Sequence, residues 1–180
     1  MTKKMTFILG GARSGKSTYA QNLAAQRGGR VLYAATAEAG DDEMRVRIAA
    51  HQAERPPDWQ TVEAPKQVGM VLLPSMITAD VVLLDCITLL TSNVLLSLPE
   101  SATVDEVQQE MDREVDGLLT AFEHGKADWI VVSNEVGLGL VPAYALGRTY
   151  RDVLGRVNQR LAQVADEVVF MVAGLPLKVK

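Results

Sequence analysis

Short runs of β-branched and other apolar residues recur along the chain, and longer stretches between them repeat apolar residues every three or four positions. The short runs predict buried strands and the longer stretches predict amphipathic helices. Strands that alternate with helices are typical of a parallel sheet covered on both faces. We therefore expect an α/β fold with a mostly parallel sheet, its strands at Thr6–Leu9, Arg30–Thr36, Val81–Asp85, Trp129–Ser133 and Val168–Val172.

Two segments carry the helical pattern clearly. In the first, from Thr103 to Glu123, Thr103 and Glu106 can form a capping box and Gly125 can end the helix. Its apolar residues form one stripe and leave an acidic face for solvent: Val104, Val107, Met111, Val115, Leu118 and Phe122. The second runs from about Tyr150 to Ala165. Its apolar side is Val153, Val157, Leu161 and Val164, and Arg151, Asp152, Asn158 and Gln159 lie elsewhere on its circumference.

The C-terminal residues predict a reversal of the chain. Gly174-Leu175-Pro176 is a turn sequence that follows the last long apolar run, and a short apolar segment comes after it. A hairpin turn makes the final strand antiparallel to its neighbour at the sheet edge. The chain has 180 residues, 48% of them hydrophobic and 22% charged, with no internal repeat. These values predict a single domain over residues 1–180.

Composition excludes several classes of partner. The formal net charge is −4, whereas nucleic-acid binding usually needs a basic face. The lone cysteine, Cys86, cannot form an internal disulfide, and the N-terminal residues lack the apolar stretch of a signal peptide. No apolar run approaches the roughly 20 residues that span a bilayer. We expect a cytoplasmic protein with neither a membrane span nor a nucleic-acid partner.

One motif points directly to chemistry. An apolar strand precedes residues 10–17 and a helical segment, Thr18–Arg27, follows them. The motif matches the phosphate-binding loop G-x-x-x-x-G-K-[ST], and this context favours it over the alternative of a glycine-rich turn without a ligand. Its backbone N–H groups would surround a β-phosphate, Lys16 would reach the β- and γ-phosphates, and Ser17 would bind Mg²⁺. The whole loop is Gly10, Gly11, Ala12, Arg13, Ser14, Gly15, Lys16 and Ser17.

Asp85 ends an apolar strand, where phosphate-loop proteins usually place the carboxylate that serves Mg²⁺. A carboxylate at the end of a buried strand is costly unless a cation offsets its charge. The alternative is a solvated loop aspartate with no metal. We expect the next residue, Cys86, to be a small buried side chain and not a nucleophile.

A third feature is the segment Asp41–Arg55, which begins with acidic residues and stops before Pro56, as a helix does. Arg47, His51 and Arg55 follow one another at intervals of four and would share one face. The arginines could hold a polyphosphate while the imidazole attacks phosphorus or transfers a proton. Spacing alone is equally compatible with a solvent-exposed face. The other histidine, His124, would complement the C-terminal dipole of its helix.

Together these motifs resemble one family, the bifunctional adenosylcobinamide kinase and adenosylcobinamide-phosphate guanylyltransferase of cobalamin biosynthesis. The resemblance covers nearly the whole chain, and it rests on the order and spacing of several motifs more than on any one. They are Gly10–Ser17, Leu32–Thr36, Asp41–His51, Leu84–Thr88, Ser133–Gly137, Tyr150–Gln159 and Ala165–Val168.

The resemblance implies a RecA-like P-loop NTPase sheet assembled as a homotrimer. It also implies two reactions: phosphorylation of the corrinoid adenosylcobinamide by ATP or GTP, then transfer of GMP from GTP to that phosphate with release of pyrophosphate. His51 matches the histidine that carries the guanylyl group, so His51 and Lys16 are the implied catalytic residues. Mg²⁺ would be held by Ser17 and Asp85.

Further nucleotide contacts follow from the same resemblance: Thr36, Ala37, Glu38, Gln52, Ala53, Glu54, Arg55, Glu63 and Asp85. Three other classes remain alternatives: a P-loop small-molecule kinase without transferase activity, a regulatory GTPase, and a non-catalytic nucleotide-binding subunit. The N-K-x-D motif by which switch GTPases read guanine is absent from the sequence. The corrinoid pocket is not identified. Four residues have two open interpretations: Asn134, Glu135, Arg148 and Arg151. They could contact the substrate or another subunit, or they could serve loop packing and surface ion pairs.

Overall fold

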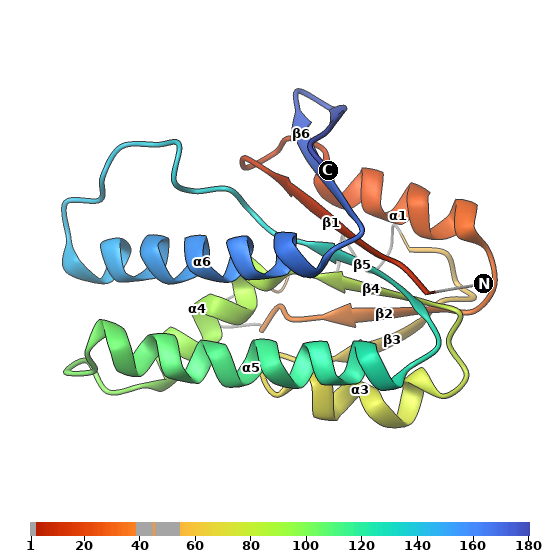
Figure 1. Ribbon diagram of the computed structural model, residues 1–180, viewed down its shortest axis with the longest axis horizontal. Helices are drawn as coiled ribbons and strands as arrows, with labels where there is room; N and C mark the ends of the chain where they lie inside the picture. The colour runs from red at the N-terminus through yellow and green to blue at the C-terminus, as the bar shows by residue number, and fades with distance from the viewer. Residues whose placement is uncertain (1–2, 39–44, 46–54) are drawn as a thin grey trace.

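The computed structural model describes residues 3–38, 45 and 55–180. Within these residues a seven-stranded sheet has the order β3-β2-β4-β5-β1-β6-β7 (Figure 1). Neighbouring strands pair in parallel, except that β6 and β7 are antiparallel. The strands are β1 (Met5–Gly10), β2 (Val31–Ala35), β3 (Gln60–Glu63), β4 (Val81–Asp85), β5 (Asp128–Val132), β6 (Glu167–Val172) and β7 (Leu175–Lys178). The expected mostly parallel sheet with an antiparallel edge strand is confirmed.

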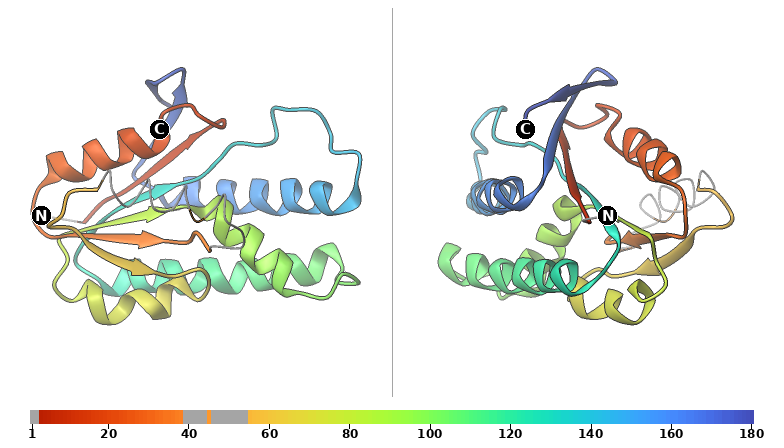
Figure 2. Two further views of the ribbon diagram at one scale, coloured as in Figure 1. Left: turned by 180° about the vertical axis from the view of Figure 1, so that it is seen from behind. Right: turned by 45° about the vertical axis from the view of Figure 1, so that its right-hand side comes forward.

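Helices cover both faces of this sheet. Figures 1 and 2 show α1 (Lys16–Arg27) on one face of the sheet. On the other face lie α3 (Val68–Met76), α4 (Ile87–Ser97), α5 (Val104–His124) and α6 (Ala145–Val164). No helix among the described residues is long and apolar enough to cross a membrane.

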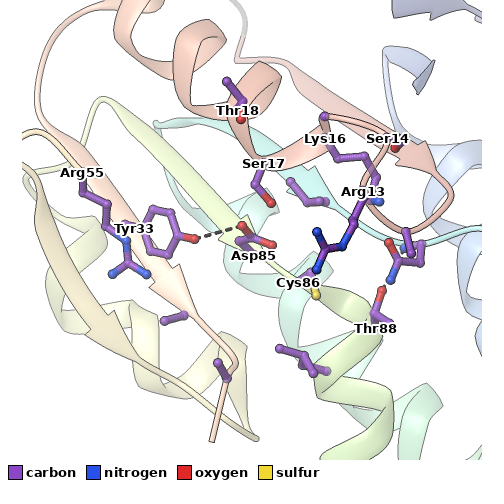
Figure 3. Close-up of a pocket in the computed structure, with 17 residues that line it drawn as sticks. Arg13, Ser14, Lys16, Ser17, Thr18, Tyr33, Arg55, Asp85, Cys86 and Thr88 are labelled. Carbon is purple, nitrogen blue, oxygen red and sulfur yellow. Dashed lines mark hydrogen bonds between the residues drawn. The ribbon is translucent and has the colours of Figure 1, made fainter. Parts of the chain in front are cut away.

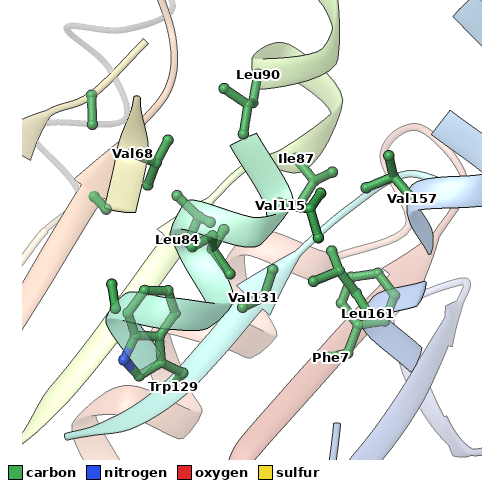
Figure 4. Packing of buried hydrophobic residues seen from close by; sticks show 14 of the residues in the cluster. Phe7, Val68, Leu84, Ile87, Leu90, Val115, Trp129, Val131, Val157 and Leu161 are labelled. Atoms are coloured by element: carbon green, nitrogen blue, oxygen red, sulfur yellow. The ribbon is translucent and has the colours of Figure 1, made fainter. Parts of the chain in front are cut away.

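The central strands are apolar on both sides because both sides are covered. Phe7 and Ile8 are adjacent in β1 and fully buried, yet they belong to different apolar clusters on opposite faces. Figure 4 shows the larger cluster, where Phe7 lies beside Leu161 of α6. Trp129 of β5 contacts Phe122 of α5 edge to face, with ring centroids 6.0 Å apart. These contacts anchor the central strands to the helices that cover them.

Local sequence signals set the ends of the longest helix. Thr103 accepts the backbone N–H of Glu106, and the Glu106 carboxylate accepts the backbone N–H of Thr103. The predicted capping box is confirmed, as is the C-cap at Gly125. The Nζ atom of Lys3 also donates to the carbonyl oxygens of Phe122, at 2.6 Å, and Gly125, at 3.0 Å. A lysine from the start of the chain therefore stabilises the negative end of α5.

Three local expectations need correction. Helix α6 begins at Ala145, five residues before the expected start at Tyr150. The hairpin turn is Ala173-Gly174, with φ angles of 51° and 82°, and Pro176 lies in β7 opposite Met171. Two consecutive positive φ angles make the tight turn whose twist suits a hairpin. Strand β3 was not expected, because its residues are mostly exposed and give no apolar run.

Candidate nucleotide-binding site

The loop between β1 and α1 has the backbone that the motif predicts. Gly10 has φ 153°, and a Cβ atom there would lie 2.6 Å from the carbonyl oxygen of Met171. Gly15 caps α1 in the left-handed region, with φ 91°. The backbone N–H of Gly174 donates to the carbonyl of Ser14 at 3.0 Å. The β6–β7 hairpin thus packs against the loop and holds its curve.

A pocket of about 550 Å³ opens between this loop and the carboxyl ends of β2, β4 and β5 (Figure 3). The loop supplies residues 12–18, and the strands and the segments after them supply Tyr33, Asp85, Asn134 and their neighbours. In open α/β sheets, ligands bind in the crevice beyond the carboxyl ends of the strands. The pocket lies at that edge.

Lys16 is almost fully buried at the first position of α1, with 9% of its surface exposed. Its Nζ atom donates to the carbonyl of Gly11 at 2.6 Å. Burial lowers the pKa of Lys16, while the nearby groups of Cys86 and Asp85 act in the opposite direction. A buried cation beside the N-terminus of a helix provides an environment that suits a phosphate.

Asp85 lies at the end of β4 and its carboxylate belongs to the pocket wall. The hydroxyl of Tyr33 donates to Oδ2 of Asp85 at 2.9 Å, the dashed line of Figure 3. The Arg55 guanidinium lies 3.6 Å from the centroid of the Tyr33 ring. Burial, and then the Asp85 carboxylate, raises the pKa of Tyr33, so its hydroxyl stays protonated and remains a donor.

Thr36 and Cys86 connect the ends of β2 and β4. Oγ1 of Thr36 donates to the carbonyl of Cys86 and accepts its N–H, both at 2.7 Å. Thr36 is fully buried and does not line the pocket, so its side chain joins two strand ends instead of facing a ligand. Burial raises the pKa of the Cys86 thiol to about 12, followed by the effect of Asp85. A thiol that is protonated at neutral pH is a poor nucleophile. Cys86 is half-buried and lines the pocket, so the expectation of a buried side chain was wrong.

The structure brings together some of the other expected residues. Ala37 and Arg55 line the pocket, whereas Glu38 and Glu63 are exposed and lie outside its lining. Arg47, His51, Gln52, Ala53 and Glu54 lie outside the described residues. His124 is at the C-terminal end of α5, where its Nδ1 is 2.8 Å from the carbonyl oxygen of Thr120.

A polar network that the sequence did not reveal holds the end of β5. Asn158, placed by periodicity away from the apolar side of its helix, is only 5% exposed. It accepts the Ser133 hydroxyl at 2.7 Å and donates to the carbonyl of Asn134 at 3.0 Å. The backbone N–H of Asn134 donates to Thr88 Oγ1 at 2.8 Å. The sequence did carry a signal for this network, because Asn158 and Gln159 are adjacent polar residues on a helix and Ser133 and Asn134 follow a buried strand. Buried hydroxyl and amide groups need hydrogen-bond partners, and these groups could have been paired with one another.

The donor set fits a Mg²⁺–triphosphate complex. The Ser17 hydroxyl and the Asp85 carboxylate both line the pocket and offer the oxygen ligands that Mg²⁺ prefers. No group of three or more His, Cys, Asp or Glu residues in the described part of the chain could hold a metal ion alone. Mg²⁺ usually takes one or two protein oxygens and completes its shell with phosphates and waters. A metal at this site therefore agrees with a triphosphate beside it.

The fold and this loop define a P-loop nucleotide-binding protein with a RecA-like sheet. One solved structure, the RadB recombinase, shares the fold with a TM-score of 0.53 at 18% identity, over 93% of this chain and 73% of that one. Residues 6–179 match the family described as cobinamide kinase / cobinamide phosphate guanyltransferase. The chain belongs to this family.

Curated relatives extend along the full chain. The bifunctional adenosylcobalamin biosynthesis protein CobU of Salmonella typhimurium is 40% identical, over 98% of this chain and 99% of its own length. CobU of Escherichia coli is 39% identical over the same shares. The bifunctional adenosylcobalamin biosynthesis protein CobP of Pseudomonas aeruginosa is 43% identical, over 96% of this chain and 95% of its own length.

Proposed function

We propose that the chain is a bifunctional transferase of cobalamin biosynthesis. It phosphorylates the hydroxyl of adenosylcobinamide with ATP or GTP and then transfers GMP from GTP to adenosylcobinamide phosphate. The observation that carries this proposal is the pocket that holds both Lys16 of the phosphate loop and the Asp85 carboxylate. Family membership over residues 6–179 gives the pocket its substrate class.

In the first reaction the chain's own groups bind and orient the triphosphate. Loop N–H groups and Lys16 surround the β- and γ-phosphates, which keeps the transferred group in line with the acceptor hydroxyl. Ser17 and Asp85 would hold Mg²⁺, which neutralises charge on the phosphate oxygens when it is bound. Tyr33 fixes one carboxylate oxygen of Asp85 by its hydrogen bond. Figure 3 shows the other oxygen on the side away from Tyr33.

In the second reaction we propose His51 as the nucleophile, on the basis of the family motif. A neutral imidazole nitrogen attacks the α-phosphorus of GTP, a P–N bond forms, and the α–β phosphoanhydride bond breaks to release pyrophosphate. A phosphate oxygen of adenosylcobinamide phosphate then attacks the same phosphorus and the P–N bond breaks. Support comes from Arg55, four residues after His51, which lines the nucleotide pocket. Arg47 would join Arg55 in holding the phosphates.

The remaining parts of the proposal concern ligands and assembly. GTP, ATP and Mg²⁺ are the proposed nucleotide ligands and metal, with Thr36–Glu38, Gln52–Arg55 and Glu63 near the nucleotide. The Thr36 side chain joins two strand ends, its backbone N–H donates to the carbonyl of Asp85, and its carbonyl accepts from Asn93. We therefore propose that Thr36 supports the site beside the nucleotide without contacting it. We also propose a cytoplasmic homotrimer. Support for an assembly comes from exposed apolar side chains in the segment after β5, including Leu138 and Leu140, which are 82% and 96% exposed.

A coupled assay tests the proposal against the kinase alternative. The protein is incubated with ATP, Mg²⁺ and adenosylcobinamide, GTP is then added, and corrinoid products and pyrophosphate are measured. Adenosylcobinamide phosphate should form first, and GTP should then yield adenosylcobinamide-GDP and one pyrophosphate per product. Phosphorylation without pyrophosphate release would reduce the function to a small-molecule kinase. No turnover in either step would leave only a nucleotide-binding subunit.

A further inference from the structure

A second cavity, of about 520 Å³, lies between α6 and the segment that follows β5. Its lining includes Glu135, Gly137, Arg151, Gly155, Arg156 and Gln159. Among the described residues, it shares no lining residue with the nucleotide pocket. None of the steps described above uses it.

Gly155 leaves space for a ligand in the wall of this cavity. The residue lies in the interior of α6, where glycine destabilises a helix relative to alanine. In the described part of the chain, a Cβ atom at Gly155 would meet no atom within 4 Å. Close packing among the described residues therefore does not require a glycine at this position. The missing side chain leaves the wall of the cavity open.

The chemistry of the lining favours a neutral polar ligand. Arg151 and Arg156 offer donors, Glu135 offers acceptors, and Gln159 offers both. The arginine charges are opposed by Glu135 and by Asp152, whose Oδ1 lies 3.2 Å from the Arg151 guanidinium. A phosphate would need an excess of positive charge, whereas primary amides need donors and acceptors together. Cobinamide carries such amides around its ring.

The two cavities meet at the carboxyl end of β5. Asn134 lines the nucleotide pocket and the next residue, Glu135, lines the second cavity. The backbone N–H of Glu135 donates to the carbonyl of Gly10 at 3.1 Å. Asn158, in the wall of the second cavity, donates to the carbonyl of Asn134 at 3.0 Å. A large acceptor could therefore extend from one cavity to the other across this strand end.

We propose that the cavity beside Gly155 binds amide side chains of the corrinoid acceptor. This inference rests on the proposed function, because it places part of that function's substrate. A side chain that fills the cavity should therefore weaken corrinoid binding and leave triphosphate binding unchanged.

The test uses Gly155→Leu and a matched control, Gly117→Leu. Gly117 is also a helical glycine whose added Cβ would meet no atom within 4 Å, but it lies in α5 and outside both cavities. Cobinamide binding is measured by equilibrium dialysis from its visible absorbance, and GTP binding by dialysis in the absence of corrinoid. We expect Gly155→Leu to weaken cobinamide binding at least about tenfold, with a GTP dissociation constant within about twofold of wild type. Gly117→Leu should match wild type in both.

Arg156→Ala provides a second variant that does not depend on helix packing, because this side chain is exposed. We expect it to weaken cobinamide binding by roughly two- to tenfold, the effect of one or two lost hydrogen bonds. Wild-type cobinamide affinity in both folded Gly155→Leu and Arg156→Ala would overturn the subsite while leaving the proposed function in place. A wild-type protein that binds GTP but no cobinamide would overturn both.

Discussion

The hydroxyl of Tyr33 donates to Oδ2 of Asp85 at 2.9 Å, from one strand of the sheet to the next. The same ring lies against the Arg55 guanidinium, so Tyr33 contacts an anion and a cation that both line the nucleotide pocket. Burial raises the pKa of Tyr33, which keeps the hydroxyl protonated through the physiological range. Tyr33 therefore connects Arg55 in the pocket wall to Asp85, the proposed metal ligand.

Replacement of Tyr33 by Phe removes this hydrogen bond and keeps the ring beneath Arg55. A hydrogen bond to a charged group contributes about 1.5–3 kcal/mol when buried, and less for the half-buried Asp85. We expect the Mg²⁺ concentration that gives half-maximal GTP binding to rise by roughly three- to tenfold, measured by titration with a fluorescent GTP analogue. Tyr19→Phe, on α1, is the control. An unchanged Mg²⁺ requirement in Tyr33→Phe would show that the carboxylate needs no such support.

Replacement of Lys16 by Met should separate binding from stability. Burial lowers the pKa of Lys16, so its charged form is less stable in the folded chain than in water. The folded chain therefore binds the Lys16 proton more weakly than the unfolded chain does. The buried charge lowers the free energy of unfolding by its full amount below the folded pKa of Lys16. This loss of stability disappears as pH rises toward the unfolded pKa of 10.5.

We therefore expect Lys16→Met to melt at the same or a higher temperature at pH 7, while triphosphate affinity and both activities fall by about a hundredfold or more. Differential scanning calorimetry and dialysis give the two quantities. Lys66→Met, which changes an exposed lysine, should alter neither. Retained turnover in Lys16→Met would remove this lysine from the site.

Replacement of His51 by Ala should prevent labelling of the protein by α-labelled GTP. The expected adduct is a phosphoramidate, which acid hydrolyses and alkali does not. Phosphorylation of adenosylcobinamide should continue in the variant, because it uses the phosphate loop. His124→Ala is the control, since that ring lies at the end of α5. An undiminished acid-labile adduct in His51→Ala would assign the guanylyl group to another residue.

Replacement of Thr103 by Ala should destabilise the fold without altering either reaction. It removes the capping box of α5, a change that costs about 1 kcal/mol. For a chain of this size the melting temperature should fall by roughly 2–4 °C. Thr120→Ala, at an exposed position in the same helix, should not lower it. A Thr103→Ala protein that melts with wild type would show that Lys3 and tertiary packing set the stability of α5.

Sequence reasoning succeeded where a feature depends on residues close together in the chain. The phosphate loop, the capping box of Thr103 and Glu106, and the hairpin at the edge of the sheet are local patterns, and each fixes its own backbone conformation. Asp85 could be placed at a strand end because a run of buried residues precedes it. Even here the turn of the hairpin lay one residue earlier than expected, since Pro176 can occupy an edge strand.

The tertiary structure decided the features that join distant segments. Tyr33 and Asp85 are 52 residues apart, and Ser133 and Asn158 are 25 apart, so no periodicity relates them. The parallel pairing of β2 and β4 places Tyr33 beside Asp85, and the packing of α6 places Asn158 beside Ser133, the residue after β5. The tertiary structure also directs Thr36 into a bond with Cys86 and opens the cavity beside Gly155. The sequence by itself determined the loop that receives a phosphate, because a local backbone conformation is encoded locally. The fold determined what surrounds it, because packing alone brings those residues together.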